Sequence, residues 1–146
     1  MIEIEKMELK DYEKIKDNLI EEFDDFWTPS ILKSELESSL SRYVVAKEVD
    51  NIVGFAGIII LPDDVEITNI VTKKTERKKG IGTLLLEKII EISKETNKEI
   101  ISLEVNEKND SAIKLYTKFG FEKVGLRKRY YNGIDNAIIM SRKIFI

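Results

Sequence analysis

The spacing of apolar residues switches several times along the chain between the two-residue period of a strand and the 3.6-residue period of a helix. Helices are expected over residues 11–23, 28–40, 81–92 and 109–119. Strands are expected over residues 2–7, 43–46, 52–61, 65–71, 100–105, 121–131 and 134–144. This order predicts an α/β (α+β) protein with a mixed sheet and helices packed on its faces.

Short local signals mark where several of these elements end. Val49-Asp50-Asn51 predicts a tight turn between the second and third strands. Asn132-Gly133 is the commonest two-residue hairpin turn and predicts that the last two strands pair. Asn109 or Asp110 is expected to cap the last helix, because both side chains accept hydrogen bonds from backbone N–H groups.

The absence of cysteine and histidine restricts the function of this 146-residue chain. The length is that of one domain, expected over residues 1–146. A chain without cysteine has no disulfide scaffold, zinc finger, iron–sulfur site or cysteine nucleophile. A chain without histidine has no Ser–His–Asp triad or imidazole base. No metal site is expected, and acid–base chemistry is left to Glu, Asp, Tyr or Lys.

Charge is distributed unequally between the two halves of the chain. Residues 1–72 carry 7 basic and 17 acidic side chains, whereas residues 73–146 carry 17 basic and 10 acidic ones. The first half therefore suits a cationic partner and the second an anionic one. The sequence pI near 5.2 argues against nucleic-acid binding. No long apolar run or signal peptide is present, so we expect a cytoplasmic protein that does not bind a membrane.

A basic, glycine-containing loop lies between the strand at 65–71 and the helix at 81–92. Arg77-Lys78-Lys79-Gly80-Ile81-Gly82-Thr83 combines cations, two glycines and a helix N-terminus, which together favour a phosphate or pyrophosphate. The loop has neither the Walker A pattern nor the third glycine of a dinucleotide fingerprint. The alternative is a glycine turn with solvated lysines.

Glu104 and Tyr116 are the candidates for acid–base chemistry. Glu104 lies within an apolar strand, and burial makes a carboxylate more basic, as a general base near neutral pH requires. Tyr116 lies twelve residues later, in the next helix, where a strand-to-helix return can bring it to the same end of the sheet. The alternatives are a solvent-facing glutamate on an edge strand and a core tyrosine.

These residues resemble the GNAT superfamily of acetyl-coenzyme-A-dependent N-acetyltransferases. Arg77-Lys78-Lys79-Gly80-Ile81-Gly82 fits the family's acyl-CoA motif, Arg/Gln-x-x-Gly-x-Gly/Ala, at every fixed position. Within the superfamily the chain is most similar to the ribosomal-protein alanine N-acetyltransferases and their archaeal relatives. That likeness covers nearly the whole chain and includes Phe26-Trp27-Thr28, Asn69-Ile70-Val71, Leu103-Glu104-Val105, Asn109, Leu115-Tyr116, Arg127, Tyr130-Tyr131 and Ala137-Ile138-Ile139-Met140.

The resemblance implies a GNAT fold, with a mostly antiparallel sheet of about seven strands flanked by about four helices. It also implies acetyl-CoA as co-substrate and a role for each matching residue. The pantetheine arm and thioester would contact backbone groups of Ile70, Val71 and Thr72 and the side chain of Asn109. The acyl-CoA motif begins at Arg77, and the pyrophosphate would bind at Lys78, Lys79, Gly80, Ile81, Gly82 and Thr83.

The resemblance also implies the catalytic and acceptor-binding residues. Glu104 resembles the proton acceptor and Tyr116 the donor that protonates the departing thiolate. The acceptor cleft would be bordered by Trp27, Tyr130 and Tyr131. Glu66, on the strand beside the cofactor, is a second candidate base, the alternative being a surface glutamate.

The acceptor amine stays open at the level of sequence. We expect a peptide or protein N-terminus, with a ribosomal protein as one candidate. A polyamine, an antibiotic or an amino acid is the alternative acceptor, and a non-catalytic acyl-CoA-binding module is the alternative function. Direct transfer needs no protein nucleophile, which suits a chain without cysteine or histidine. The sequence is compatible with a monomer or a homodimer.

Overall fold

The computed structural model describes residues 1–23 and 29–145. The predicted acceptor-site residue Trp27 lies outside these residues. The strands are β1 (Ile2–Lys6), β2 (Ser41–Glu48), β3 (Asn51–Ile60), β4 (Val65–Thr72), β5 (Ile100–Asn106), β6 (Glu122–Tyr131) and β7 (Asp135–Lys143). The helices are α1 (Leu9–Ile15), α2 (Leu19–Glu22), α3 (Pro29–Glu37), α4 (Ile81–Ser93) and α5 (Asp110–Lys118), with 3₁₀ turns at Lys16–Asn18 and Lys74–Glu76.

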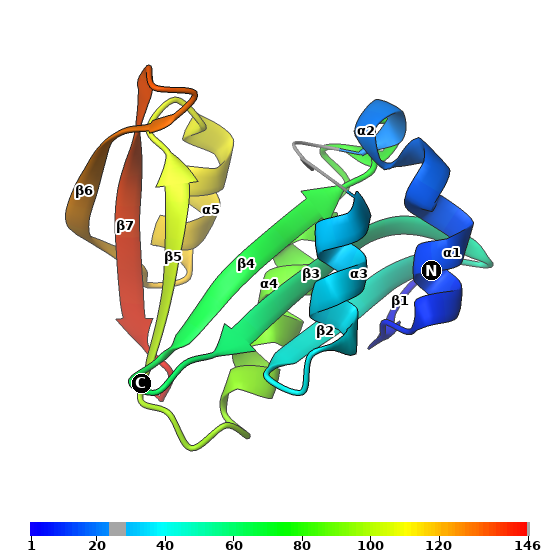
Figure 1. Cartoon of the computed structure of the whole chain (residues 1–146), viewed down its shortest axis with the longest axis horizontal. Coiled ribbons are helices and arrows are strands. Elements are labelled where there is room, and N and C mark those ends of the chain that lie inside the picture. Colours follow the sequence, from blue (N-terminus) through cyan, green and yellow to red (C-terminus); the bar gives the residue numbers. More distant parts are fainter. Residues whose placement is uncertain (24–28, 146) are drawn as a thin grey trace.

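The seven strands form one sheet in the order β1-β2-β3-β4-β5-β7-β6. Neighbouring strands pair antiparallel except β4 and β5, which are parallel. Figure 1 shows β4 and β5 diverging from the end where they pair, so that the sheet opens like a V. The mixed, mostly antiparallel sheet of seven strands with flanking helices confirms the predicted GNAT fold.

Each face of the sheet has its own apolar core. One core packs α4 and α5 against the sheet through Leu85, Ile89 and Tyr116. The other packs α1, α2 and α3 against the opposite face through Tyr12, Leu19 and Leu32, among others. Tyr12 and Ile15 of α1, and Leu85 and Ile89 of α4, recur at helical spacing and are buried, as predicted. The helix predicted over 28–40 is shorter than expected, because α3 ends at Glu37 and Leu40 is exposed.

Two other local predictions also differ from the structure. The helix expected over 11–23 starts earlier, at Leu9, and is interrupted by the 3₁₀ turn at Lys16–Asn18. Asp and Asn favour alternatives to the helical backbone, which explains the interruption at Asp17-Asn18. The first hairpin turn is also shorter than expected, because β3 begins at Asn51 and Val49 adopts a left-handed φ of 58°.

The last two strands pair as predicted, and Asn132 (φ 53°) and Gly133 (φ 68°) both have the positive φ of a type I′ turn. Their connection is one residue longer than the predicted two-residue turn, because Tyr131 pairs with Asp135 and Ile134 lies in the loop. Within the two described stretches of chain, no helix has the length and apolar character needed to cross a membrane.

Candidate active site

The divergence of β4 from β5 exposes backbone groups of β4. The two strands pair only at Val65↔Ile101 and Glu66↔Ser102. Farther along, Ile70, Val71 and Thr72 pair with β3 on one side only. Backbone groups on the β5-facing edge of β4 therefore have no strand partner beyond Glu66 among the described residues, as the predicted pantetheine contact requires.

A bulge turns this part of β4 relative to the sheet. Ile67 pairs with Ile58 and Asn69 with Gly57, so Thr68 is the extra residue. As a result, Thr68 and Asn69 both reach the Tyr43 hydroxyl, at 3.1 and 2.6 Å. The same hydroxyl donates to Glu35 of α3 at 2.8 Å. The Tyr43 hydroxyl thus links the bulge of β4 to α3.

The basic loop has the geometry of an anion site. Gly80 is the N-cap of α4 with a left-handed φ of 79°, and no side chain caps this helix. The N–H groups of the first turn, at Ile81, Gly82 and Thr83, are therefore left for an anion, which the helix dipole favours. Lys78 precedes them with a left-handed φ of 66°, and Lys79 pairs with Glu76 at 3.0 Å.

Asn109 caps α5, as predicted, by accepting a hydrogen bond from the Ala112 N–H at 3.2 Å. The side-chain oxygen of Asn109 also accepts from Ser111. The Asn109 amide nitrogen makes no hydrogen bond with a described residue and remains for a ligand. The first turn of α4 packs close to the middle of α5, because a side-chain carbon added to Gly82 would lie 3.5 Å from the Leu115 side chain.

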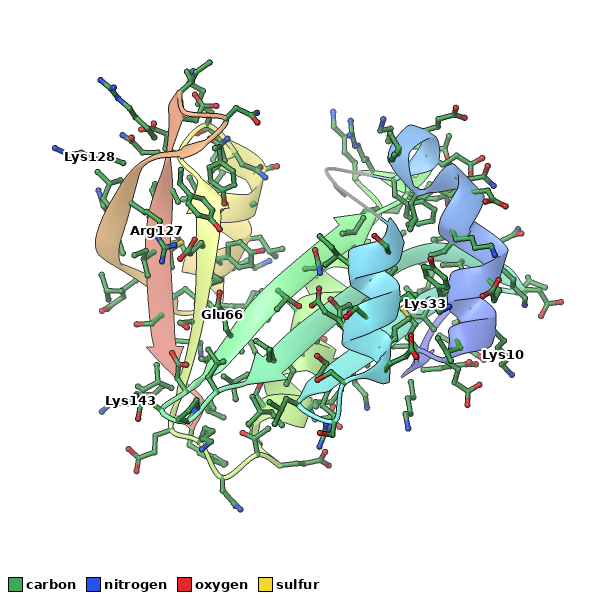
Figure 2. The ribbon with its side chains drawn as sticks, viewed as in Figure 1. Lys10, Lys33, Glu66, Arg127, Lys128 and Lys143 are labelled. Carbon is green, nitrogen blue, oxygen red and sulfur yellow. The ribbon has the colours of Figure 1, made fainter. Side chains whose placement is uncertain are left out.

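Glu66 of β4 and Glu104 of β5, here called the carboxylate pair, lie on adjacent strands. An Nη2 atom of Arg127, on β6, lies 2.8 Å from Glu104 Oε1. Burial and the nearby Glu104 charge raise the pKa of Glu66, while Arg127 opposes the rise. Glu104 is thus paired, rather than unpartnered in an apolar strand, and its side chain is 18% exposed. Figure 2 labels Glu66 and Arg127.

Tyr131 lies near Glu104 of the carboxylate pair, and Tyr116 lies near Tyr131. Burial raises the pKa of Tyr131 to about 12, and the charge of Glu104 adds to the rise. Burial likewise raises the pKa of Tyr116 to about 12, with a smaller contribution from Tyr131. Tyr131 is therefore close enough to influence both predicted catalytic groups. Tyr116 stays protonated at neutral pH, and its hydroxyl makes no hydrogen bond with a described residue, so it is available as a donor.

Sequence reasoning missed two parts of this site. Arg127 was named only because of the family resemblance. The spacing of residues along one strand cannot predict its ion pair with Glu104, which lies on a different strand. The Tyr43 network was also missed, although β4 carries a signal for it. Its apolar positions change parity between Ile67 and Ile70, which is typical of a bulge.

No group of acidic side chains among the described residues could hold a metal ion. A hollow of about 580 Å³ lies around the start of β2 and is lined by residues such as Ser41, Arg42 and Tyr43. Neither carboxylate of the pair lines it, whereas Tyr43 and Glu35 of the hydrogen-bond network at the β4 bulge do.

Comparisons with known proteins agree with this geometry. A Bacillus subtilis (strain 168) relative is 36% identical over 94% of this chain and 92% of its own length. The [ribosomal protein bS18]-alanine N-acetyltransferase of Haemophilus influenzae is 40% identical over 68% of this chain and 72% of its own. The crystal structure of the Escherichia coli ribosomal-protein-S18-alanine N-acetyltransferase superposes with a TM-score of 0.89 at 25% identity, covering 100% of this chain and 96% of that one. The model of the acetyltransferase (GNAT) family matches residues 3–121, and the chain belongs to this family.

Proposed function

We propose that this N-acetyltransferase transfers the acetyl group of acetyl-CoA directly to the α-amine of a protein N-terminus, with a ribosomal protein as the first candidate acceptor. One observation carries the proposal: the carboxylate pair lies where β4 and β5 diverge, with Tyr131 near Glu104 and the Tyr116 hydroxyl, which is free to donate, near Tyr131. The relatives named as ribosomal-protein alanine N-acetyltransferases support this choice of acceptor.

The acceptor amine must lose a proton before it attacks the thioester. A peptide α-amine titrates near 8, so its deprotonation at pH 7 costs about 1 kcal/mol, against roughly 4–5 kcal/mol for a lysine. A single carboxylate suffices for the first task. Glu104 is the proposed proton acceptor, and Glu66 is the alternative on the adjacent strand.

The transfer then needs an acid and a donor for the developing oxyanion. The carboxylate first passes the ammonium proton to solvent. The neutral amine nitrogen then bonds to the acetyl carbon as the C–S bond breaks, the nitrogen's second proton goes to the carboxylate, and the Tyr116 hydroxyl protonates the sulfur and regains its proton from solvent. A backbone N–H near Val71 would stabilise the oxyanion. At the other end of the ligand, the first turn of α4 would hold the pyrophosphate.

The acceptor class is tested by measuring coenzyme A release with acetyl-CoA and three acceptors. These are a peptide with a free N-terminal alanine or serine, an N-terminally blocked peptide with an internal lysine, and spermidine. Turnover confined to the free N-terminus supports the proposal. Turnover on spermidine alone assigns the enzyme to small amines, and coenzyme A binding without any transfer favours a non-catalytic module.

The catalytic roles are tested by substituting each group without changing its shape. Glu104→Gln and Tyr116→Phe should each lower kcat by about 10²-fold, the typical contribution of a general base or acid. The Kd for coenzyme A should stay within about twofold, because neither residue lies in the α4 loop. A larger loss of kcat in Glu66→Gln than in Glu104→Gln would identify Glu66, on β4, as the general base. Unchanged turnover in Glu104→Gln, Glu66→Gln and Tyr116→Phe would contradict the mechanism.

A further inference from the structure

Arg127 is the cation that balances the carboxylate pair. It contacts Glu104 directly at 2.8 Å, and its charge is also felt by Glu66, whose pKa it lowers against the effects of burial and of Glu104. The neighbouring Lys128 points away from the sheet in Figure 2. The guanidinium of Arg127 therefore occupies a position where a cation is stabilised by two carboxylates from different strands.

The Arg127 guanidinium is not fixed in this position. Its side chain is 54% exposed, and exposed ion pairs change an equilibrium constant by about fivefold or less. Its second contact is the ring of Tyr130, whose centroid lies 4.9 Å from Arg127 Cζ. Both residues lie on β6, at the edge of the sheet, and the pairing of β6 with β7 is irregular between Arg127 and Tyr131.

An acceptor amine needs the same carboxylate oxygens. Proton transfer requires its nitrogen within hydrogen-bond distance of the base, roughly 2.6–3.2 Å. The guanidinium already holds one Glu104 oxygen at such a distance. Two cations cannot share that position without repulsion in partly buried surroundings. The guanidinium and a substrate ammonium are therefore competitors.

We propose that Arg127 occupies the ammonium-binding position of the free enzyme and that the acceptor amine displaces it. The inference rests on the proposed function, since it takes the carboxylate pair as the place where the amine binds. The ring of Tyr130 gives the displaced guanidinium a contact that it already makes, which limits the cost of the exchange. Arg127 is then a specificity residue, because only a ligand with a cationic amine can replace it.

The test measures the binding of alaninamide, a minimal α-ammonium ligand, to the coenzyme-A-saturated protein at pH 7.5 by titration calorimetry. Arg127→Gln removes the competitor and should lower the Kd of alaninamide by about fivefold, or about 1 kcal/mol. Lys128→Gln removes the same charge from the next residue and should leave the Kd unchanged. Arg127→Lys keeps a cation on a flexible stem and should stay close to the wild type.

Weaker binding of alaninamide to Arg127→Gln would overturn the inference, because Arg127 would then be helping the ligand to bind. An equal Kd in the wild type and Arg127→Gln would overturn it as well. N-acetyl-alaninamide, which has no ammonium group, should not distinguish the variants, and a gain equal to that of alaninamide would contradict displacement by charge.

Binding and turnover separate this inference from the proposed function. Tighter alaninamide binding to Arg127→Gln without transfer to any peptide would support the displacement and reject the proposed acceptor. Transfer to the free N-terminal peptide, with an acceptor KM that Arg127→Gln leaves unchanged or raises, would support the function and reject the displacement.

Discussion

Tyr43 uses the full hydrogen-bonding capacity of its hydroxyl, with one proton donated and two lone pairs occupied. It donates to Glu35 and accepts from the Asn69 amide, and Thr68 makes the third contact. Asn69 is only 8% exposed, so water cannot easily replace this partner. At the scale of single residues, one phenolic oxygen holds the bulge of β4 in place.

Tyr43→Phe should therefore lower the free energy of unfolding by about 1–3 kcal/mol, since it leaves buried polar groups without a partner. Urea unfolding measures this loss. Tyr12→Phe is the matched control, because Tyr12 is equally buried but its hydroxyl makes no hydrogen bond with a described residue. Its effect should stay within about 0.5 kcal/mol. Equal losses in the two variants would show that the hydroxyl network adds no stability.

At the scale of elements, the sequence predicts best where periodicity and burial coincide. The stripe Ile81, Leu85 and Ile89 predicts α4 because these side chains are its buried face. The break at Lys16–Asn18 escapes prediction, since the apolar spacing runs on through it to Leu19 and both flanking helices bury their stripe. Pattern also cannot predict the contact of Arg127 with Glu104, which depends on the register of an exposed edge strand with little alternation.

The loop before α4 allows a prediction for a whole element. Gly80→Ala places an L residue at φ 79° and should cost roughly 1–2 kcal/mol of stability. Gly133→Ala, at φ 68° in the last hairpin, should cost the same, because an added side-chain carbon meets no atom within 4 Å at either position. Relaxation of the strained loop changes the direction of the first N–H groups of α4. Of the two variants, only Gly80→Ala should therefore weaken coenzyme A binding, by about tenfold.

Urea unfolding and coenzyme A titration of both glycine variants check this pair of expectations. If Gly80→Ala loses stability but binds coenzyme A like the wild type, the N-terminus of α4 does not hold the pyrophosphate. An equal loss of affinity in Gly133→Ala would point to a general loosening of the fold.

At the scale of the whole molecule, two cores share one sheet. Tyr43 belongs to the core beneath α1 and α3, whereas Tyr116 belongs to the core beneath α4 and α5. Strands β2 and β3 place residues in both cores, Val44 and Val45 on opposite faces for example. We therefore propose that residues 1–146 form a single domain in which neither core survives the loss of the other.

The same arrangement predicts how stability depends on alkaline pH. Burial raises the pKa of Tyr43, Tyr116 and Tyr131 above the usual value near 10, to about 12 for Tyr116 and Tyr131. Above pH 10 the unfolded chain loses these protons while the folded protein keeps them. The free energy of unfolding should therefore be unaffected below pH 10 and then fall by about 1.4 kcal/mol per pH unit for each tyrosine.

Urea midpoints measured from pH 8 to 11 test this dependence, and lysines that titrate in the same range add to the fall. The difference between the wild type and Tyr116→Phe isolates the contribution of one tyrosine. Above pH 10, the free energy of unfolding of the variant should therefore fall less steeply with pH than that of the wild type. Because the two cores depend on one sheet, far-ultraviolet circular dichroism and tyrosine absorbance should report a single shared transition at each pH. Parallel pH profiles of stability for the wild type and Tyr116→Phe would show that Tyr116 ionises as easily in the folded protein as in the unfolded chain. Different transitions by circular dichroism and by tyrosine absorbance would show that the molecule unfolds as two units.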